Sequence, residues 1–228
     1  MTASPDDRPS GFASPPCFLH EVDPEFGVAA VDPQQATDVA RWRAAERKRL
    51  IAARLAMPTD VRATYGARIA TTLAEAIGNP SGAIVSAYWP FRGEPDLRDL
   101  MARLVADGGR IALPVVVEKG RPLAFRTWRP GDPLARGVWN IPIPEAGEEV
   151  VPDIVLAPVV GFDPDGYRLG YGGGFFDRTL AAARPRPRVF GVGYAAQAIA
   201  TIFPQPHDIP MDRIVTEAGA TNSRAGPD

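Results

Sequence analysis

The segment RLGYGGGFFDR, residues 168–178, places four glycines within five positions between an arginine and an aspartate. Glycines leave successive backbone N–H groups free to converge on an anion, and the start of a following helix adds a favourable partial charge. Arg168 would supply a full positive charge at the edge of such a loop, and Asp177 could bind Mg²⁺ directly or through water. The segment therefore predicts a phosphate site beside an acid. The alternative is a flexible glycine-rich turn in which Asp177 is only solvated.

Two common phosphate-binding patterns do not fit this segment. The dinucleotide pattern GxGxxG would require a third glycine at position 175, where the chain has Phe175. The Walker A pattern requires GK[ST], and Lys48 and Lys119 both lie far from the loop in sequence. The segment is thus predicted to bind an anion through its backbone, without either familiar motif.

A second concentration of positive charge lies in residues 34–56, which are predicted to form a helix that ends before Pro58. Within this helix Arg43 and Arg47 are four positions apart, so their guanidinium groups point from the same face. The pair could bind an anion together, or it could belong to an ordinary exposed basic face.

Strands and helices alternate along the rest of the chain. Further helices are predicted from Thr59, a plausible N-cap, to Ile77, over the amphipathic segment 95–109, and from residue 174 onward. Strands are predicted over residues 83–89, 110–117, 121–128, 153–162, 188–194 and 212–219, with irregular chain and short pieces of structure over 130–152. This order predicts a three-layer α/β/α fold with a mostly parallel, Rossmann-like sheet. Ligands of such sheets bind beyond the carboxyl ends of the strands, where the glycine-rich segment is expected to lie.

The composition excludes several classes of protein. A chain of 228 residues, 45% of them hydrophobic, fits one domain of ordinary size. The net charge of −2 argues against non-specific nucleic-acid binding, and no apolar run is long enough to suggest a membrane span. The single cysteine, Cys17, excludes an internal disulfide. We expect a cytoplasmic protein, monomeric or homodimeric, that acts on a small molecule.

Three parts are predicted along the chain. Residues 1–35 form a proline-rich, extended or partly disordered N-terminal extension, residues 36–219 form the α/β domain, and residues 220–228 form a flexible tail. The extension contains the more apolar stretch CFLHEVDPEFG, residues 17–27. This stretch either packs along the domain or a partner subunit, or brings His20 and Glu21 near a site.

The longer stretch VLAPVVGFDPDGYRLGYGGGFFDRTL, residues 155–180, resembles the signature of the 5-formyltetrahydrofolate cyclo-ligase family. Supporting segments follow in the same order as in that family: residues 54–57, 86–100, 109–116 and 206–219. The resemblance covers about residues 36–219. It implies conversion of 5-formyltetrahydrofolate and ATP into 5,10-methenyltetrahydrofolate, ADP and phosphate, with Mg²⁺ and through a phosphorylated formyl group.

The resemblance also implies a role for each matching residue. The catalytic residues would be Arg168, Gly172 and Asp177, and the metal ion would be bound by Asp177 and Asp208. Reduced folate would contact Trp89, Phe91, Glu94 and Phe176, with the Glu94 carboxylate accepting pterin N–H groups. ATP would contact Arg43, Arg47, Arg168, Leu169, Gly170, Tyr171, Gly172, Gly173, Gly174, Phe175 and Phe176.

Several of these residues also have ordinary structural explanations. Glu94 could simply favour the N-terminus of the following helix, and Trp89 and Phe91 could belong to the core. His207 is better explained as a structural histidine, while Trp139 could either line the ligand site or cap the core.

Two positions depart from the family pattern. Arg43 stands where the family often has lysine, and Phe176 stands where tyrosine commonly precedes the signature aspartate. Because the tyrosine hydroxyl is missing, one alternative remains: a catalytically altered paralogue that serves as a folate- or nucleotide-binding module. A more distant alternative is an enzyme that handles sugar phosphates or coenzyme A on a similar scaffold.

Overall fold

The computed structural model describes residues 33–222. The chain separates into two compact units, Met1–Thr37 and Asp38–Asp228, and the fold described below is that of the second unit. The apolar stretch at residues 17–27, with His20 and Glu21, lies outside the described residues, so the predictions made for it remain predictions.

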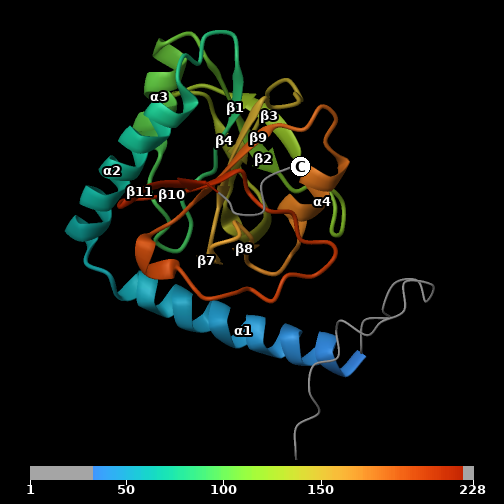
Figure 1. Cartoon of the computed structure of the whole chain (residues 1–228). Helices are drawn as coiled ribbons and strands as arrows, with labels where there is room; N and C mark the ends of the chain where they lie inside the picture. The colour runs from blue at the N-terminus through green and yellow to red at the C-terminus, as the bar shows by residue number, and fades with distance from the viewer. Residues whose placement is uncertain (1–32, 223–228) are drawn as a thin grey trace, which may run out of the picture. The chain divides into compact units, whose positions relative to one another are not determined.

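A seven-stranded sheet forms the centre of the fold, in the order β11–β10–β9–β6–β1–β2–β3 (Figure 1). All pairs from β10 to β2 are parallel, whereas the edge strands β3 and β11 run antiparallel to their neighbours. The prediction of a mostly parallel sheet is therefore confirmed. The seven strands are β1 (Ile84–Ser86), β2 (Arg110–Val115), β3 (Ala124–Trp128), β6 (Ile154–Pro158), β9 (Arg188–Val192), β10 (Arg213–Thr216) and β11 (Gly219–Asn222).

Helices and two small hairpins surround this sheet. The helices are α1 (Pro33–Ala56), α2 (Thr59–Ile77), α3 (Arg98–Ala106) and α4 (Phe175–Ala182), with short 3-10 turns η1 (Val138–Asn140) and η2 (Ala195–Gln197). The hairpins pair β4 (Leu134–Arg136) with β5 (Pro142–Pro144), and β7 (Gly161–Phe162) with β8 (Arg168–Leu169). None of the helices within residues 33–222 is long and apolar enough to cross a membrane.

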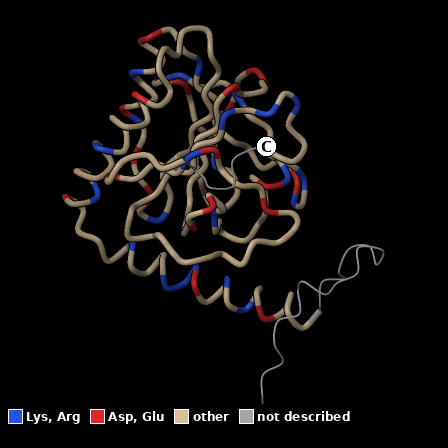
Figure 2. The backbone as a smooth tube through the Cα atoms, in the orientation of Figure 1, with Lys and Arg blue, Asp and Glu red and all other residues tan. Residues whose placement is uncertain are grey.

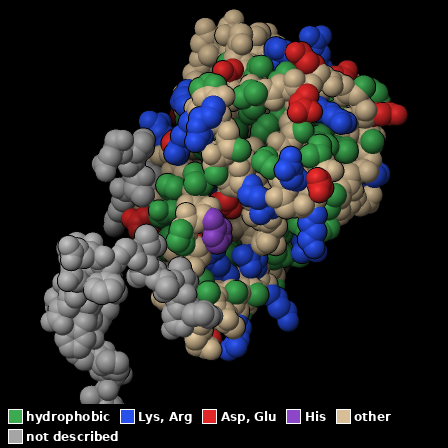
Figure 3. All heavy atoms as spheres, turned by 90° about the vertical axis from the view of Figure 1, so that its right-hand side faces the viewer, with side chains coloured by type: hydrophobic (Ala, Val, Ile, Leu, Met, Phe, Trp, Pro, Cys, Tyr) green, Lys and Arg blue, Asp and Glu red, His purple; other side chains and the backbone are tan. Residues whose placement is uncertain are grey.

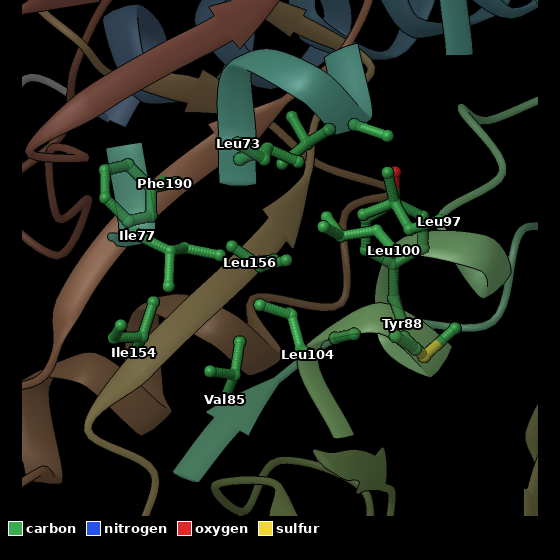
Figure 4. Close-up of a cluster of buried hydrophobic side chains, with 14 of the residues drawn as sticks. Leu73, Ile77, Val85, Tyr88, Leu97, Leu100, Leu104, Ile154, Leu156 and Phe190 are labelled. Atoms are coloured by element: carbon green, nitrogen blue, oxygen red, sulfur yellow. The ribbon is translucent and has the colours of Figure 1, made fainter. Parts of the chain in front are cut away.

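The two faces of the sheet are covered by different helices because strand side chains alternate between faces. On β6, Leu156 packs with Leu73 of α2 and Leu100 of α3 in one buried cluster (Figure 4). Val155, one position earlier, packs with Leu180 of α4 in a second cluster on the opposite face. The three-layer α/β/α arrangement is thus confirmed.

Helix α1 packs beyond the carboxyl ends of the central strands, where Leu50 joins Val160 and Leu169 in a third buried cluster (Figure 1). This packing brings the basic face of α1 to the end of the sheet at which ligands of parallel sheets bind.

Three local predictions need correction, and a fourth, irregular chain with short pieces at 130–152, gains detail. Thr59 is the first helical residue of α2 rather than its N-cap, which is Pro58 without a side-chain hydrogen bond. The predicted strand over 153–162 is two strands, because the chain leaves the central sheet after Pro158 and pairs as β7 with β8. The segment 130–152 contains the β4–β5 hairpin. Strand β11 includes the first three residues of the predicted tail, 220–222.

Charge is distributed evenly over the fold, as Figure 2 shows, with acidic and basic side chains interleaved along most elements. Several basic side chains on the surface have acidic partners, such as Arg110 with Glu148 and Arg186 with Asp212.

Candidate active site

Every site residue predicted from the sequence lines a single cavity at the carboxyl ends of the strands. The lining comes from α1, the β1–α3 loop, the β2–β3 hairpin, the end of β6, the β4–β5 hairpin, the segment from β8 into α4, and the turn at residues 206–208. Figure 3 shows this side of the molecule, where basic and hydrophobic side chains adjoin a histidine. The fold therefore brings together residues that are up to 165 positions apart, such as Arg43 and Asp208.

The β8–α4 loop holds its shape through glycine backbone. Gly172 has φ +93° and Gly174, the N-cap of α4, has φ +61°, conformations that other residues adopt only under strain. A Cβ at Gly172 would also stand in van der Waals contact with the Arg47 guanidinium, 3.4 Å from its Cζ. The glycines are therefore required by the loop geometry, and the alternative of a loose solvated turn does not hold.

Arg43 is buried and all three of its guanidinium nitrogens are engaged. Nη2 and Nη1 donate to the Asp208 carboxylate at 2.5 and 3.3 Å, and Nε and Nη2 donate to the carbonyls of Ile202 and Phe203 at 2.9 and 2.8 Å. Such a forked, charge-assisted contact fixes both partners. Arg43 therefore joins α1 to the turn that carries Asp208.

Arg47 lies on the same face of α1 but has a different environment. Its Nε donates to the carbonyl of Gly170 at 2.7 Å, which holds the guanidinium against the glycine-rich loop. Among residues 33–222, no carboxylate lies within ion-pair distance of Arg47. Burial, and next the neighbouring charge of Arg43, lower the pKa of Arg47. This side chain is a half-buried cation with no anionic partner in the cavity.

Arg168 is buried at the base of the loop and is also incompletely satisfied. Its Nη2 lies 3.2 Å from Oδ1 of Asp177, which is close enough for an ion pair. However, neither Nε nor Nη2 makes a hydrogen bond to any described residue, so this contact lacks hydrogen-bond geometry. The guanidinium carbon lies 5.2 Å from the ring centre of Phe176. Burial lowers the pKa of Arg168, and the charge of Asp177 opposes that effect. Unsatisfied buried donors of this kind indicate a missing anionic or polar partner.

Glu94 is buried on the opposite wall of the cavity. Its Oε2 accepts a hydrogen bond from the backbone N–H of Phe91 at 2.9 Å, and its Oε1 accepts one from the hydroxyl of Tyr171 at 2.8 Å. Burial raises the pKa of Glu94 to about 7, and Arg54 is the first of the groups that oppose this effect. Glu94 lies four residues before α3, so the explanation as a helix N-terminal acid is wrong; Asp99 occupies that position.

Aromatic side chains form the rim near Glu94. The rings of Phe91 and Trp139 are within 10° of parallel with centres 6.4 Å apart, and Trp139 is 53% exposed. Trp139 therefore lines the cavity rather than capping the core. Trp89 has both proposed roles, because it lines the cavity and packs edge-on against Trp128 at 5.6 Å. His207 is also at the rim with its side chain 74% exposed, so it is not a buried structural histidine.

The predicted metal ligands are both paired with arginine. Asp208 is held by Arg43, and Asp177 by Arg168. Within residues 33–222, no three side chains of His, Cys, Asp or Glu come together as a ready-made metal site. Mg²⁺ is usually held by only one or two carboxylates together with substrate phosphate oxygens, so this donor set fits a metal that arrives with a nucleotide.

Sequence reasoning missed one functional connection. Arg54, near the end of α1, is 2% exposed and donates to the carbonyls of Arg92 and Val159 and to the hydroxyl of Tyr171. The signals in the sequence were a charged residue following the apolar positions Leu50 and Ile51 of the helix, and its place in the supporting segment 54–57. Tyr171, which lines the cavity and was predicted as a nucleotide contact, directs its hydroxyl to Glu94.

Comparisons with known proteins agree with this site. The model of the 5-formyltetrahydrofolate cyclo-ligase family matches residues 39–217. The chain is 34% identical over 144 residues to the 5-formyltetrahydrofolate cyclo-ligase of Mycolicibacterium smegmatis, covering 60% of this chain and 74% of that protein. It is also 34% identical over 140 residues to the Escherichia coli K12 enzyme, covering 58% and 76%.

Solved structures give the same result for the fold. The NMR structure of Aquifex aeolicus 5,10-methenyltetrahydrofolate synthetase superposes with a TM-score of 0.69 at 28% identity, covering 82% of this chain and 95% of that one. A 5,10-methenyltetrahydrofolate synthetase from Mycoplasma pneumoniae, at 22% identity and a TM-score of 0.64, shares the fold and covers 77% and 98%. The family match covers most of the chain and includes all of the cavity residues from α1 to the 206–208 turn. The chain therefore belongs to the 5-formyltetrahydrofolate cyclo-ligase family, as its glycine-rich signature predicted.

Proposed function

We propose that this chain catalyses the ATP-dependent cyclisation of 5-formyltetrahydrofolate to 5,10-methenyltetrahydrofolate, with release of ADP and phosphate. The observation that carries the proposal is a pair of arginines at the glycine-rich loop: Arg168 has buried donors without a hydrogen bond, and Arg47 contacts the loop but no carboxylate among residues 33–222. A triphosphate supplies the anionic oxygens that these donors lack. Glu94, across the same cavity, is a buried acceptor suited to pterin N–H donors.

The chemistry explains why two substrates must meet in one cavity. A formamide oxygen is a poor leaving group, so the formyl oxygen first attacks the γ-phosphorus of ATP and the bond to ADP breaks. N10 then attacks the carbon of the resulting iminium phosphate, which is still bonded to N5, and loses its proton to solvent. The C–O bond breaks last, phosphate leaves with the original formyl oxygen, and the five-membered ring is closed. The protein's main tasks are to align the two substrates and to stabilise charge on the transferring phosphoryl group.

The residues of the cavity divide these tasks by position. Arg47, Arg168 and the backbone N–H groups of residues 170–174 bind the phosphate oxygens. Glu94 orients the pterin, and the nearly parallel rings of Phe91 and Trp139 form an apolar wall for the planar part of the folate.

The residues that would hold Mg²⁺ are Asp177 and Asp208, together with phosphate oxygens of the nucleotide. Mg²⁺ bound there would neutralise part of the phosphate charge. Arrival of the nucleotide would also give Arg43 and Arg168 alternative anionic partners, which frees the two carboxylates that they hold in this structure.

A direct assay tests the proposal. Purified protein, 5-formyltetrahydrofolate and MgATP should generate the absorbance of the methenyl product and equal amounts of ADP, with neither formed when ATP is omitted. Binding of both ligands without turnover would contradict the catalytic claim and support the binding-module alternative. Stabilisation by phosphate esters alone, without any response to folate, would instead indicate the sugar-phosphate or coenzyme A alternative.

A variant of Arg47 tests the observation on which the proposal rests. Arg47→Met should lower kcat/KM for ATP by about 100-fold, because it removes a charge-assisted contact to the phosphates. Arg49→Met is the matched control, since Arg49 lies on the same helix but is exposed and paired with Glu46. The control should change kcat/KM by less than about twofold. Equal effects of the two changes would contradict the assignment of Arg47.

A further inference from the structure

A buried chain of hydrogen bonds connects helix α1 to the folate side of the cavity through the glycine-rich loop. Arg54 donates Nη2 to the hydroxyl of Tyr171, and that hydroxyl donates to Oε1 of Glu94 at 2.8 Å. The three side chains come from α1, the β8–α4 loop and the β1–α3 loop, and are separated by up to 117 positions in sequence. Tyr171 is the middle member of the chain and the only one carried by the glycine-rich loop.

Each end of the chain is anchored independently of Tyr171. Arg54 also donates Nε to the carbonyl of Arg92 at 2.9 Å and Nη1 to the carbonyl of Val159 at 3.2 Å. Glu94 also accepts the backbone N–H of Phe91 on its other oxygen. The hydroxyl of Tyr171 is therefore not needed to hold either side chain in the fold. What it adds is a second donor to the carboxylate, backed by the guanidinium charge.

We infer that Tyr171 is a positioning residue for folate recognition: with Arg54 behind it, it holds the Glu94 carboxylate ionised and turned toward the cavity. This inference rests on the proposed function and deepens it. Each carboxylate oxygen uses one lone-pair site for Tyr171 or Phe91 and keeps another free for an N–H donor of the ligand. A protonated or rotated Glu94 would offer at most one good acceptor to the pterin.

The groups around Glu94 show what the hydroxyl of Tyr171 contributes to its ionisation. Burial raises the pKa of Glu94 to about 7, so at neutral pH the carboxyl is balanced between its two forms. The other titratable groups that face it are Arg54, a cation, and the tyrosines Tyr88, Tyr171 and Tyr194, whose pKa values are all raised, chiefly by burial. The tyrosines stay neutral in the physiological range. Arg54 and the hydroxyl of Tyr171 are therefore the side chains that favour the ionised form.

Tyr171→Phe tests the inference, with Tyr167→Phe as the matched control. Tyr167 belongs to the same buried cluster as Tyr171, but no contact of its hydroxyl reaches Glu94. The first measurement uses no ligand: the free energy of unfolding is determined by denaturant titration between pH 4 and pH 9. Loss of the hydroxyl donor should raise the pKa of Glu94 in the folded protein by about one unit. The pH at which the free energy of unfolding stops falling should therefore be about one unit higher in Tyr171→Phe, and unchanged in Tyr167→Phe.

The second measurement is the affinity for 5-formyltetrahydrofolate over the same pH range, without nucleotide. The midpoint below which binding weakens should move upward by about one pH unit in Tyr171→Phe, so that binding at pH 6.5 falls by up to about tenfold. At pH 9, where Glu94 is ionised in both proteins, the variants should bind within about threefold of each other. A merely structural role for Tyr171 would weaken binding equally at every pH.

The two measurements separate the inference from the proposed function. Unchanged pH midpoints in both would overturn the role of Tyr171. If the pH dependence of the unfolding free energy shifts but the wild-type protein binds no 5-formyltetrahydrofolate, the role of the hydrogen-bond chain is supported and the folate assignment fails. If the pH dependence of the unfolding free energy shifts but folate binding does not depend on pH, Glu94 does not recognise the pterin and the inference is overturned.

Discussion

Replacing Glu94 by glutamine is expected to stabilise the ligand-free fold at alkaline pH while weakening folate binding. Burial raises the pKa of Glu94 from 4.5 to about 7, and Arg54, Tyr171 and the Phe91 N–H only partly oppose this effect. The folded protein therefore holds the Glu94 proton more tightly than the unfolded chain does. The stability that this proton contributes is fully present below pH 4.5 and is lost as the pH rises to about 7.

The size of the effect follows from the pKa difference. At about 1.4 kcal/mol per pKa unit, the ionised carboxylate costs the folded state about 3 kcal/mol above pH 7. Glutamine avoids this cost but retains only one acceptor oxygen, so one hydrogen bond worth about 1 kcal/mol is lost. The net expectation at pH 8 is a gain of about 2 kcal/mol, or a Tm higher by about 4–8 °C for a domain of this size.

The assay is denaturant unfolding of wild type and Glu94→Gln at pH 5, 6, 7 and 8, with Glu118→Gln as the control. Glu118 is exposed, so its replacement should change the free energy of unfolding by less than about 0.5 kcal/mol at every pH. The difference between Glu94→Gln and wild type should grow from near zero at pH 5 to its full value at pH 8. A difference that does not vary with pH, or a variant less stable than wild type at pH 8, would refute the reasoning.

Three further predictions concern the glycine-rich loop. Asp177→Asn should lower turnover by about 100-fold and raise the Mg²⁺ concentration needed for half-maximal rate; near-normal turnover would remove Asp177 from the metal site. Gly172→Ala should destabilise the fold by about 1 kcal/mol and raise the KM for ATP, because its φ is +93° and its Cβ would meet Arg47. Gly120→Ala, at φ +83° with nothing within 4 Å, should show the same loss of stability with an unchanged KM. Phe176→Tyr should change kcat by less than about threefold, since the ring already contacts Arg168; a gain above tenfold would support the altered-paralogue alternative.

Local patterns in the sequence predicted most of the fold because they depend on neighbouring residues. The alternation of Ile154, Val155 and Leu156 between the two faces of the sheet follows from strand geometry alone. The break after Pro158 does not, because β7 forms only where β8 is available to pair with it. The chain is equally apolar on both sides of the break, so its periodicity carries no signal for the change of partner.

The site residues could be predicted individually, but their partners could not. The family signature and its supporting segments indicate Asp177, Asp208 and Glu94, yet give no indication that two of them are held by arginines. The contact between Tyr171 and Glu94 spans 77 positions, and it exists because the glycine-rich loop folds back over the β1–α3 loop. Such pairings depend on tertiary geometry and lie outside any local pattern.

The arginine pair on α1 shows how far spacing alone can be interpreted. Arg43 and Arg47 share a face, as their separation of four predicts, and both line the cavity. Their chemistry nevertheless differs. The Arg43 guanidinium donates hydrogen bonds to one carboxylate and two carbonyls, whereas Arg47 donates to the Gly170 carbonyl and forms no ion pair with a described residue. A lysine at position 43 would present a single charged nitrogen and could not reproduce the forked contact with Asp208. The departure from the family pattern at Arg43 therefore concerns how the 206–208 turn is fixed before the nucleotide binds, whereas Arg47 can meet a phosphate without releasing a carboxylate.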